Sequence, residues 1–194
     1  MILYIHGFAS SGLGGKAKMV REYFGEKAFA PSLPYVPDLA IDTLIQIAEQ
    51  AKRCREPLHL IGSSLGGFYA LYLAERFGLR AVLVNPSVRP WETLVAHTGQ
   101  GTNYYDGAHF EWTPQHVESL RKYRVSALSH PEKILLMLQT GDEVLDYRVA
   151  LEELKGTELL IEEGGDHSFR DFSRHLPRIE AFFHHPESLR SSAP

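Results

Sequence analysis

The stretch Leu58-His-Leu-Ile-Gly-Ser-Ser-Leu-Gly-Gly67 organises the rest of the chain. Its apolar, strand-like start breaks at Gly62, and a helix-forming run begins at Phe68, two residues after Gly66. Between them the sequence fits G-x-S-x-G, the pattern of a serine on a sharp turn between a strand and a helix. Glycine on either side removes the Cβ atoms that would clash at such a turn. We therefore expect Ser64 to project from the end of a strand as a nucleophile.

The pattern is short, and glycine–serine turns are common between strands and helices, so its surroundings have to support it. A preceding strand and a following helix are the context that it needs. The amide of Leu65, directly after Ser64 and ahead of the helix, is placed to donate to a developing oxyanion. Ser63 is a competing hydroxyl, but it lies off the centre of the glycine frame and is expected to face a neighbouring strand or loop.

Composition limits the class of protein. With 194 residues, 44% hydrophobic and 23% charged, the chain suits one globular domain, residues 1–194. A net charge of −4 does not indicate nucleic-acid binding. The single cysteine, Cys54, excludes an intrachain disulfide and fits a reducing compartment. Because we find neither a signal peptide nor a membrane span, we expect a cytoplasmic protein.

The order of the elements predicts the fold class. Apolar runs predict strands at residues 2–5, 28–30, 58–61, 81–84, 134–139 and 159–161. Helical patterns occupy residues 16–24, 39–54 (with Asp38 as N-cap), 68–77, 146–154 and 172–184, and the tail from Pro186 is expected to fray. Strands that alternate with helices predict an α/β protein whose mostly parallel, twisted sheet carries helices on both faces. Ligands of such sheets bind at the carboxyl ends of the strands.

Residues 87–131 interrupt this alternation and are rich in aromatic residues and histidine. A segment of this length favours a small lid of helix and loop over the cleft. The alternative is a layer of surface helices with no role in substrate binding. The histidines lack a ligand spacing such as H-E-x-x-H, so we expect no metal site.

The same edge of the sheet receives a base and an acid. His167, in a glycine-rich loop after the last predicted strand, can take a proton from a serine near neutral pH. Asp142 comes first in the turn after the preceding strand and is expected to orient His167. Asp146 is better placed to cap a helix, Glu143 to face solvent, and Asp166 to diverge from its neighbour His167. The order serine, acid, histidine is that of the α/β-hydrolases.

The loop after the first strand, His6-Gly7-Phe8, supplies the remaining part. An oxyanion hole needs a second amide from this loop, and the amide of Phe8 is the natural donor. His6 is expected to hold the loop in shape. The run Gly12–Lys16 is faintly like a phosphate-binding loop, but Ser10 and Ala17 break the Walker pattern.

Together, these motifs resemble the small YqiA-like esterases of the α/β-hydrolase superfamily, from Met1 to about Phe183. The more particular features are His6-Gly7-Phe8 followed by two serines, Asn85-Pro86 after a strand, and Gly164-Gly-Asp-His167. The resemblance implies an α/β-hydrolase fold and a serine esterase that needs no cofactor. It implies carboxylic esters with short acyl chains as substrates, and acyl-CoA thioesters as a further possibility.

Other functions are compatible with the same residues. A thioesterase, a peptidase and a C–C bond hydrolase use the same triad, and the sequence does not separate them. A dehalogenase is disfavoured because its nucleophile is a carboxylate. A non-catalytic receptor for a small acyl ligand is a further alternative. The presence of all three triad residue types argues against it.

Overall fold

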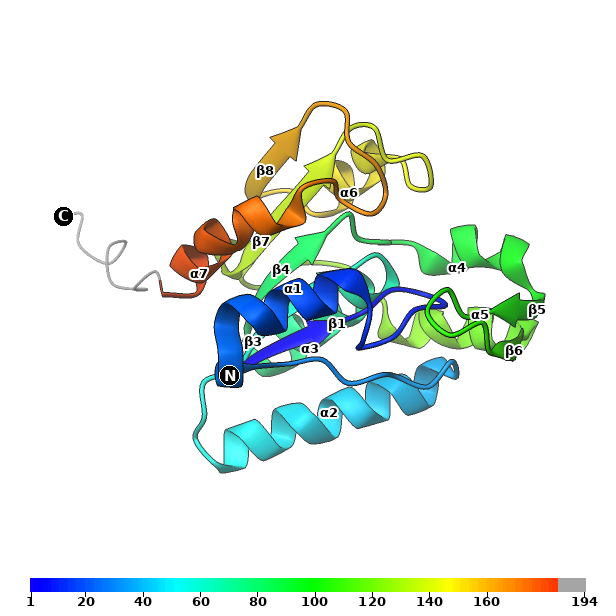
Figure 1. Ribbon diagram of the computed structural model, residues 1–194, viewed down its shortest axis with the longest axis horizontal. Coiled ribbons are helices and arrows are strands. Elements are labelled where there is room, and N and C mark those ends of the chain that lie inside the picture. Colours follow the sequence, from blue (N-terminus) through cyan, green and yellow to red (C-terminus); the bar gives the residue numbers. More distant parts are fainter. Residues whose placement is uncertain (185–194) are drawn as a thin grey trace.

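A computed structural model of the chain describes residues 1–184. Its elements are β1 Ile2–Ile5, α1 Gly15–Phe24, β2 Ala28–Phe29, α2 Pro37–Arg53, β3 His59–Ser63, α3 Leu65–Phe77, β4 Arg80–Val84, α4 Pro90–Thr93, β5 Gly99–Thr102, β6 His109–Trp112, α5 Pro114–Leu120, β7 Ile134–Gln139, α6 Tyr147–Glu153, β8 Glu158–Glu162 and α7 Leu176–His184 (Figure 1). The predicted fraying from Pro186 concerns residues outside the described part. Across residues 1–184, no helix combines the length and apolar character needed to cross a membrane.

The predicted parallel sheet is confirmed. Six strands pair in the order β2-β1-β3-β4-β7-β8, and every pairing in this sheet is parallel. The strands β3, β7 and β8 therefore direct their carboxyl ends to one edge, and the loops that follow them carry Ser64, Asp142 and His167. This shared edge is where an α/β sheet places its ligands.

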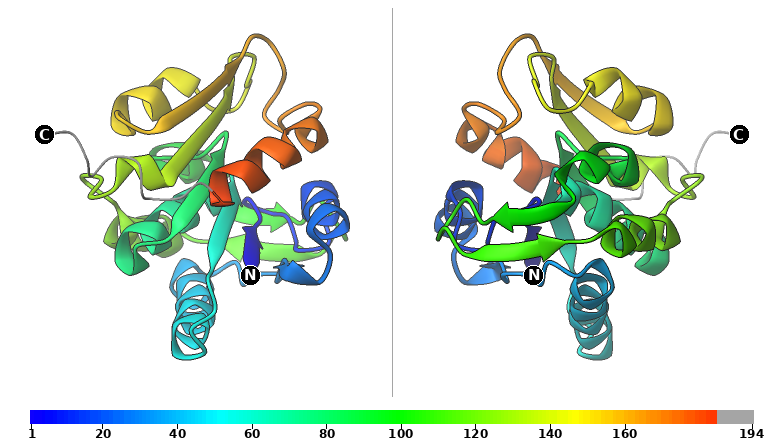
Figure 2. Two further views of the ribbon diagram at one scale, coloured as in Figure 1. Left: turned by 90° about the vertical axis from the view of Figure 1, so that its left-hand side faces the viewer. Right: turned by 90° about the vertical axis from the view of Figure 1, so that its right-hand side faces the viewer.

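Helices cover both faces of the sheet (Figures 1 and 2). Alternate side chains of each strand point to opposite faces, so Leu3 and Ile5 belong to one core and Ile2 and Tyr4 to the other. The first core is completed by α2, α3 and α6, and the second by α1 and α7. Burial on both faces explains why these strands are continuously apolar in sequence.

The helix after the nucleophile turn begins earlier than predicted, at Leu65 instead of Phe68. Its first turn is built on Gly66 and Gly67, whose low helix propensity favoured a later start in the sequence. Packing requires these glycines. A Cβ on Gly66 would lie 2.1 Å from the carbonyl oxygen of Ile5, and one on Gly62 would lie 2.2 Å from the carbonyl oxygen of Gly66. The turn therefore brings β1, β3 and α3 into backbone contact.

The N-cap prediction for α2 was wrong. The helix begins at Pro37, because proline is well suited to the first helical position, so Asp38 lies inside the first turn. Its carboxylate instead accepts hydrogen bonds from Lys122 Nζ at 2.8 Å and from Tyr123 Oη at 2.6 Å. These contacts lower the pKa of Asp38. They also fasten the end of the 87–131 segment to α2.

The 87–131 segment contains more than the predicted helix and loop. Besides α4 and α5 it forms an antiparallel hairpin, β5–β6, with Gly99 paired with Trp112 and Thr102 with His109. In Figure 1 the hairpin lies beyond the carboxyl end of β1, which the arrowhead marks. Trp91, Trp112 and Leu120 are buried and join the core beneath α2 and α3. The segment is therefore packed onto the sheet's carboxyl edge.

We expect Gly62→Ala to destabilise the protein by about 1–3 kcal/mol or more, because the new methyl group would meet the backbone of Gly66, which cannot rotate away. Gly15→Ala is the matched control, since nothing lies within 4 Å of its added Cβ. Urea unfolding of both variants measures the difference. Equal free energies of unfolding for the two variants would contradict this account of the turn.

Candidate active site

Ser64 occupies the turn between β3 and α3 in a strained conformation, with φ 55° and ψ −121°. Positive φ is rare for a residue with a side chain and persists only when its surroundings fix it. The amide of Ser64 donates to the carbonyl of Val84 at 3.1 Å, and its carbonyl accepts from the amides of Gly67 at 2.9 Å and Ser87 at 3.0 Å. With a fourth contact, from the amide of Phe68 at 3.4 Å, these backbone hydrogen bonds hold the residue at the end of the sheet.

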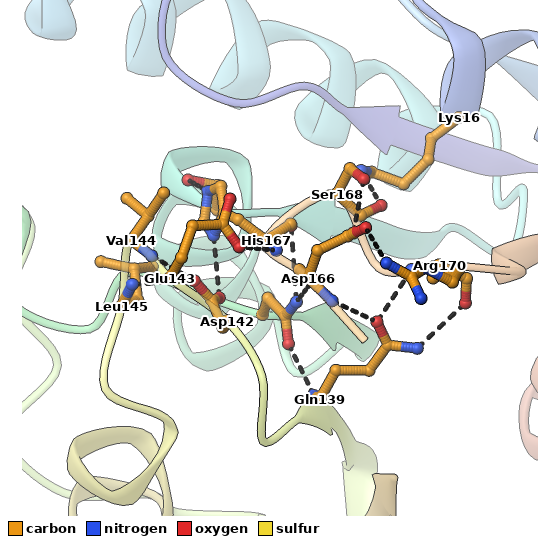
Figure 3. A network of polar contacts seen from close by, with 12 residues as sticks. Lys16, Gln139, Asp142, Glu143, Val144, Leu145, Asp166, His167, Ser168 and Arg170 are labelled. Atoms are coloured by element: carbon orange, nitrogen blue, oxygen red, sulfur yellow. Dashed lines mark hydrogen bonds and ion pairs between the residues drawn. The ribbon is translucent and has the colours of Figure 1, made fainter. Parts of the chain in front are cut away.

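The structure brings Ser64, His167 and Asp142 together. His167 Nε2 lies 3.1 Å from Ser64 Oγ, and His167 Nδ1 lies 2.8 Å from Asp142 Oδ2. Figure 3 shows the carboxylate of Asp142 facing the imidazole. With Nδ1 donating to the carboxylate, Nε2 is left as the acceptor for the serine proton. The Asp142 side chain is 3% exposed and that of His167 is 22% exposed, so the imidazole remains accessible.

The carboxylate of Asp142 is fixed by its own turn. Its second oxygen, Oδ1, accepts from the amides of Val144 at 2.9 Å and Leu145 at 2.8 Å. These contacts leave Oδ2 directed at His167. The other candidate acids lie elsewhere, as predicted: Asp146 caps α6 through the amide of Arg148 at 3.0 Å, and Asp166 accepts from the hydroxyl of Ser168 at 2.6 Å.

Two buried side-chain amides, from residues that are each only 2% exposed, hold the histidine loop, a role that the sequence did not predict. Asn85 Nδ2 donates to the carbonyl of Asp166 at 3.0 Å, and its Oδ1 accepts from the backbone amide of Gln139 at 2.9 Å. Gln139 Oε1 accepts from the amides of Asp166 at 3.1 Å and Arg170 at 2.8 Å. Gln139 ends β7 and Asn85 directly follows β4, each after a run of at least four apolar residues, and this change was the available signal.

Two further side chains, Glu143 and Lys16, contact the same loop (Figure 3). Glu143 is exposed, as predicted, yet its Oε2 accepts from the amide of His167 at 3.0 Å. Lys16 Nζ, at the start of α1, donates to the carbonyl of Ser168 at 2.6 Å. The pKa of Lys16 is lowered, because the effect of burial exceeds the opposing effect of the carboxylates of Asp166 and Asp142. The loop around His167 is therefore tied to several elements.

Two backbone amides near Ser64 have the character of an oxyanion hole. Gly7 lies against Ser64, since a Cβ added there would be 3.2 Å from Ser64 Cβ. Among the described residues, the amides of Phe8 and Leu65 have no hydrogen-bond acceptor. They are free to donate to a ligand at this edge. A small pocket lined by Gly7, Phe8, Leu65 and Tyr69 adjoins them.

His6 holds the His6-Gly7-Phe8 loop in shape, as expected. Its Nε2 accepts from the amide of Leu33 at 2.9 Å, and its Nδ1 donates to the carbonyl of Gly7 at 2.8 Å. Burial lowers the pKa of His6, which favours the neutral ring that this pairing requires. Ser63 is also accounted for, because it is buried and its side chain hydrogen-bonds with that of Tyr4. Within residues 1–184, no cluster of three metal-ligating side chains occurs.

Solved structures share this architecture at low sequence identity. A putative hydrolase from Agrobacterium vitis S4 aligns with a TM-score of 0.71 at 18% identity, over 94% of this chain and 87% of the other. The mouse alpha/beta hydrolase domain-containing protein 10 gives 0.66 at 16%, over 93% and 87%. A monoacylglycerol lipase from Paleococcus ferrophilus gives 0.64 at 16%, over 94% and 93%. These likenesses establish the α/β-hydrolase fold.

Sequence comparison identifies the family. A UPF0227 protein of Shewanella sp. strain MR-4 is 29% identical over 187 residues, which cover 94% of this chain and 98% of that protein. A UPF0227 protein of Serratia proteamaculans strain 568 is 29% identical with the same coverage. The model of the "Uncharacterised protein family (UPF0227)" matches residues 1–184. The chain therefore belongs to the UPF0227 family, in agreement with the resemblance to YqiA-like proteins drawn from its motifs.

Proposed function

We propose that this protein is a serine hydrolase that cleaves carboxylic esters, with Ser64 as nucleophile, His167 as general base and Asp142 as orienting acid. The observation that carries the proposal is the continuous line of contacts from Asp142 Oδ2 through His167 to Ser64 Oγ, at 2.8 Å and 3.1 Å. Three groups from three separate loops meet at hydrogen-bonding distance, in the arrangement that activates a hydroxyl.

In the acylation step, His167 Nε2 takes the proton of the Ser64 hydroxyl while Oγ attacks the ester carbonyl. The negative charge that develops on the carbonyl oxygen is stabilised by the amides of Phe8 and Leu65. The amino-terminal end of α3 adds a favourable potential at the same place. Collapse of the tetrahedral intermediate breaks the ester bond, and the imidazolium of His167 returns its proton to the departing alcohol.

In the deacylation step, water replaces the alcohol. His167 takes a proton from this water as it attacks the acyl carbon, and the same two amides stabilise the second tetrahedral intermediate. Release of the acid returns the proton to Ser64 Oγ. The cycle is complete without a cofactor. Asp142 stays ionised throughout and stabilises the imidazolium that forms in each half-reaction.

The substrate class is inferred from the motifs and from the size of the pocket. We propose short-chain acyl esters, with acyl-CoA thioesters next, because the motifs resemble those of small esterases and the pocket beside Phe8 and Leu65 is small. Two of the similar solved structures are named as an esterase domain, from Rhodothermus marinus, and a monoacylglycerol lipase. The 87–131 segment would border this cleft as a lid.

Replacing the nucleophile tests the proposal. We expect Ser64→Ala to abolish nearly all turnover in a panel of p-nitrophenyl esters, acyl-CoAs and aminoacyl amides, because no other positioned hydroxyl can form the acyl-enzyme. Ser63→Ala is the matched control and should keep its activity, since that hydroxyl is buried away from His167. A fluorophosphonate probe should label the parent protein at Ser64.

Two outcomes would contradict the nucleophile assignment. Full activity in Ser64→Ala together with loss of activity in Ser63→Ala would identify Ser63, not Ser64, as the nucleophile. A parent protein that binds an acyl ligand but neither turns over nor labels would favour the receptor alternative. The panel also separates esterase, thioesterase and peptidase activities.

The orienting acid has its own test. We expect Asp142→Asn to lower kcat by about 10³–10⁴, because the amide NH₂ cannot accept from Nδ1 and would favour the wrong imidazole tautomer. Its carbonyl can still accept from Val144 and Leu145, so the melting temperature should change little. Asp146→Asn is the control, since asparagine caps a helix about as well as aspartate. Equal losses in the two variants would show that charge at this edge, not orientation of His167, is what matters.

A further inference from the structure

We infer that the β5–β6 hairpin is a clamp that fixes the oxyanion loop, residues 8–10, and that Asn103 at its tip is a positioning residue for the Phe8 amide. This inference rests on the proposed function, because it concerns the same reaction. It assigns the 87–131 segment a role beyond covering the cleft: part of the oxyanion hole is held in place from outside the sheet.

Asn103 connects the hairpin to the loop. Its side chain is buried, with Nδ2 donating to the carbonyl of Ser10 at 3.1 Å and to the hydroxyl of Tyr35 at 2.9 Å. Its Oδ1 accepts from the amide of Tyr105 at 2.8 Å, which orders the hairpin tip. One carboxamide therefore joins three segments, and each of its polar atoms has a partner.

A backbone contact adjacent to this carboxamide fixes a strained residue. Ala9, which follows the proposed oxyanion donor, has a φ of 51°. A conformation of this kind in a residue with a side chain is retained only where the surrounding structure imposes it. The carbonyl of Ala9 accepts from the amide of Tyr104 at 2.8 Å, and Tyr104 directly follows Asn103. The hairpin thus holds the peptide that sets the direction of the loop after Phe8.

Aromatic packing holds the Phe8 side chain against the same hairpin. Its ring meets those of Trp112 at a centroid distance of 4.9 Å and Phe110 at 5.6 Å, both edge to face. Phe110 is in turn stacked on Tyr35 at 3.9 Å. Trp112, 1% exposed, is anchored through Nε1 to the carbonyl of Leu94 at 3.1 Å. The Phe8 ring therefore packs on two aromatic side chains, Trp112 and Phe110, that are themselves fixed.

Gly101 makes this packing possible. It pairs with Phe110 across the hairpin, and a Cβ added there would lie 2.5 Å from the Phe110 ring. Glycine leaves room for the ring to lie across its own partner strand and reach Phe8 and Tyr35. The polar contacts to the backbone after Phe8 and the aromatic contacts to its ring therefore both originate in the hairpin. A displaced hairpin would turn the Phe8 amide away from the oxyanion.

The test uses Asn103→Asp in the full-length protein. The carboxylate can still accept from Tyr105 but cannot donate to the Ser10 carbonyl, so the tip stays ordered while the clamp is lost. Two quantities are compared: kcat and KM for p-nitrophenyl butyrate, and the affinity for trifluoromethyl propyl ketone. Ser64 Oγ adds to the carbonyl carbon of this ketone and passes its proton to His167, leaving an oxyanion that needs the same amides.

We expect kcat of Asn103→Asp to fall by about 10- to 100-fold, with ketone affinity falling in parallel, because a misdirected oxyanion donor is felt only when the charge forms. KM should stay close to that of the parent. The melting temperature should fall, because the substitution places a charge in a buried position beside the carbonyl of Ser10, so the kinetics are measured on folded protein well below it. Thr102→Ala is the matched control: the side chain of this exposed neighbour hydrogen-bonds with His109 across the hairpin, and the variant should behave as the parent does. Tyr35→Phe removes one of the two hydrogen bonds that Asn103 Nδ2 donates and keeps the ring. It should show a smaller loss of kcat and of ketone affinity, and it carries the test if Asn103→Asp does not fold.

Unchanged kcat and ketone affinity in folded Asn103→Asp would overturn the clamp while leaving the proposed function intact. A raised KM and a lowered melting temperature with kcat and ketone affinity preserved would likewise overturn it, because they would indicate a structural or substrate-binding role. A parent protein without any turnover would instead overturn the proposed function, and the inference with it.

Discussion

The backbone turn at residue 64 is the constraint on which the site depends. A residue held at positive φ between β3 and α3 requires the strand, the helix and the end of β1 to approach at backbone distance, and Gly62 and Gly66 alone leave space for this. The same approach places the first amide of α3 beside the loop at Gly7. Formation of the nucleophile turn and of the candidate oxyanion hole is therefore a single packing event, not two independent features.

The positions of His167 and Asp142 depend on a second, polar constraint. Their loops would be free to diverge if only apolar contacts held them, because each loop leaves the sheet at its solvent edge. Asn85 and Gln139 prevent this by supplying buried amide groups to the backbone of the histidine loop. Since both are almost fully buried, their hydrogen bonds are expensive to leave unmade, which favours one arrangement of the loop.

Local patterns predicted a large part of this. The strands at residues 2–5 and 134–139 have the predicted bounds, since continuous apolar runs mark buried parallel strands. The residues chosen as nucleophile, acid and base lie within hydrogen-bonding distance, because strand order and loop position determine that edge. Their catalytic roles stay predictions.

Long-range contacts explain what the sequence did not reveal. The hairpin strand Gly99–Thr102 has no apolar alternation, since it is stabilised by Phe110 and by contacts with the oxyanion loop. Asp38 satisfied a capping rule but paired with residues more than eighty positions away. The conformation of Ser64 has a further consequence: a strained residue of this kind costs about 1–3 kcal/mol, which glycine would largely relieve. Directed evolution that rewards only thermal tolerance would therefore favour glycine at position 64. Under the proposed function, a simultaneous growth requirement for turnover would retain the serine.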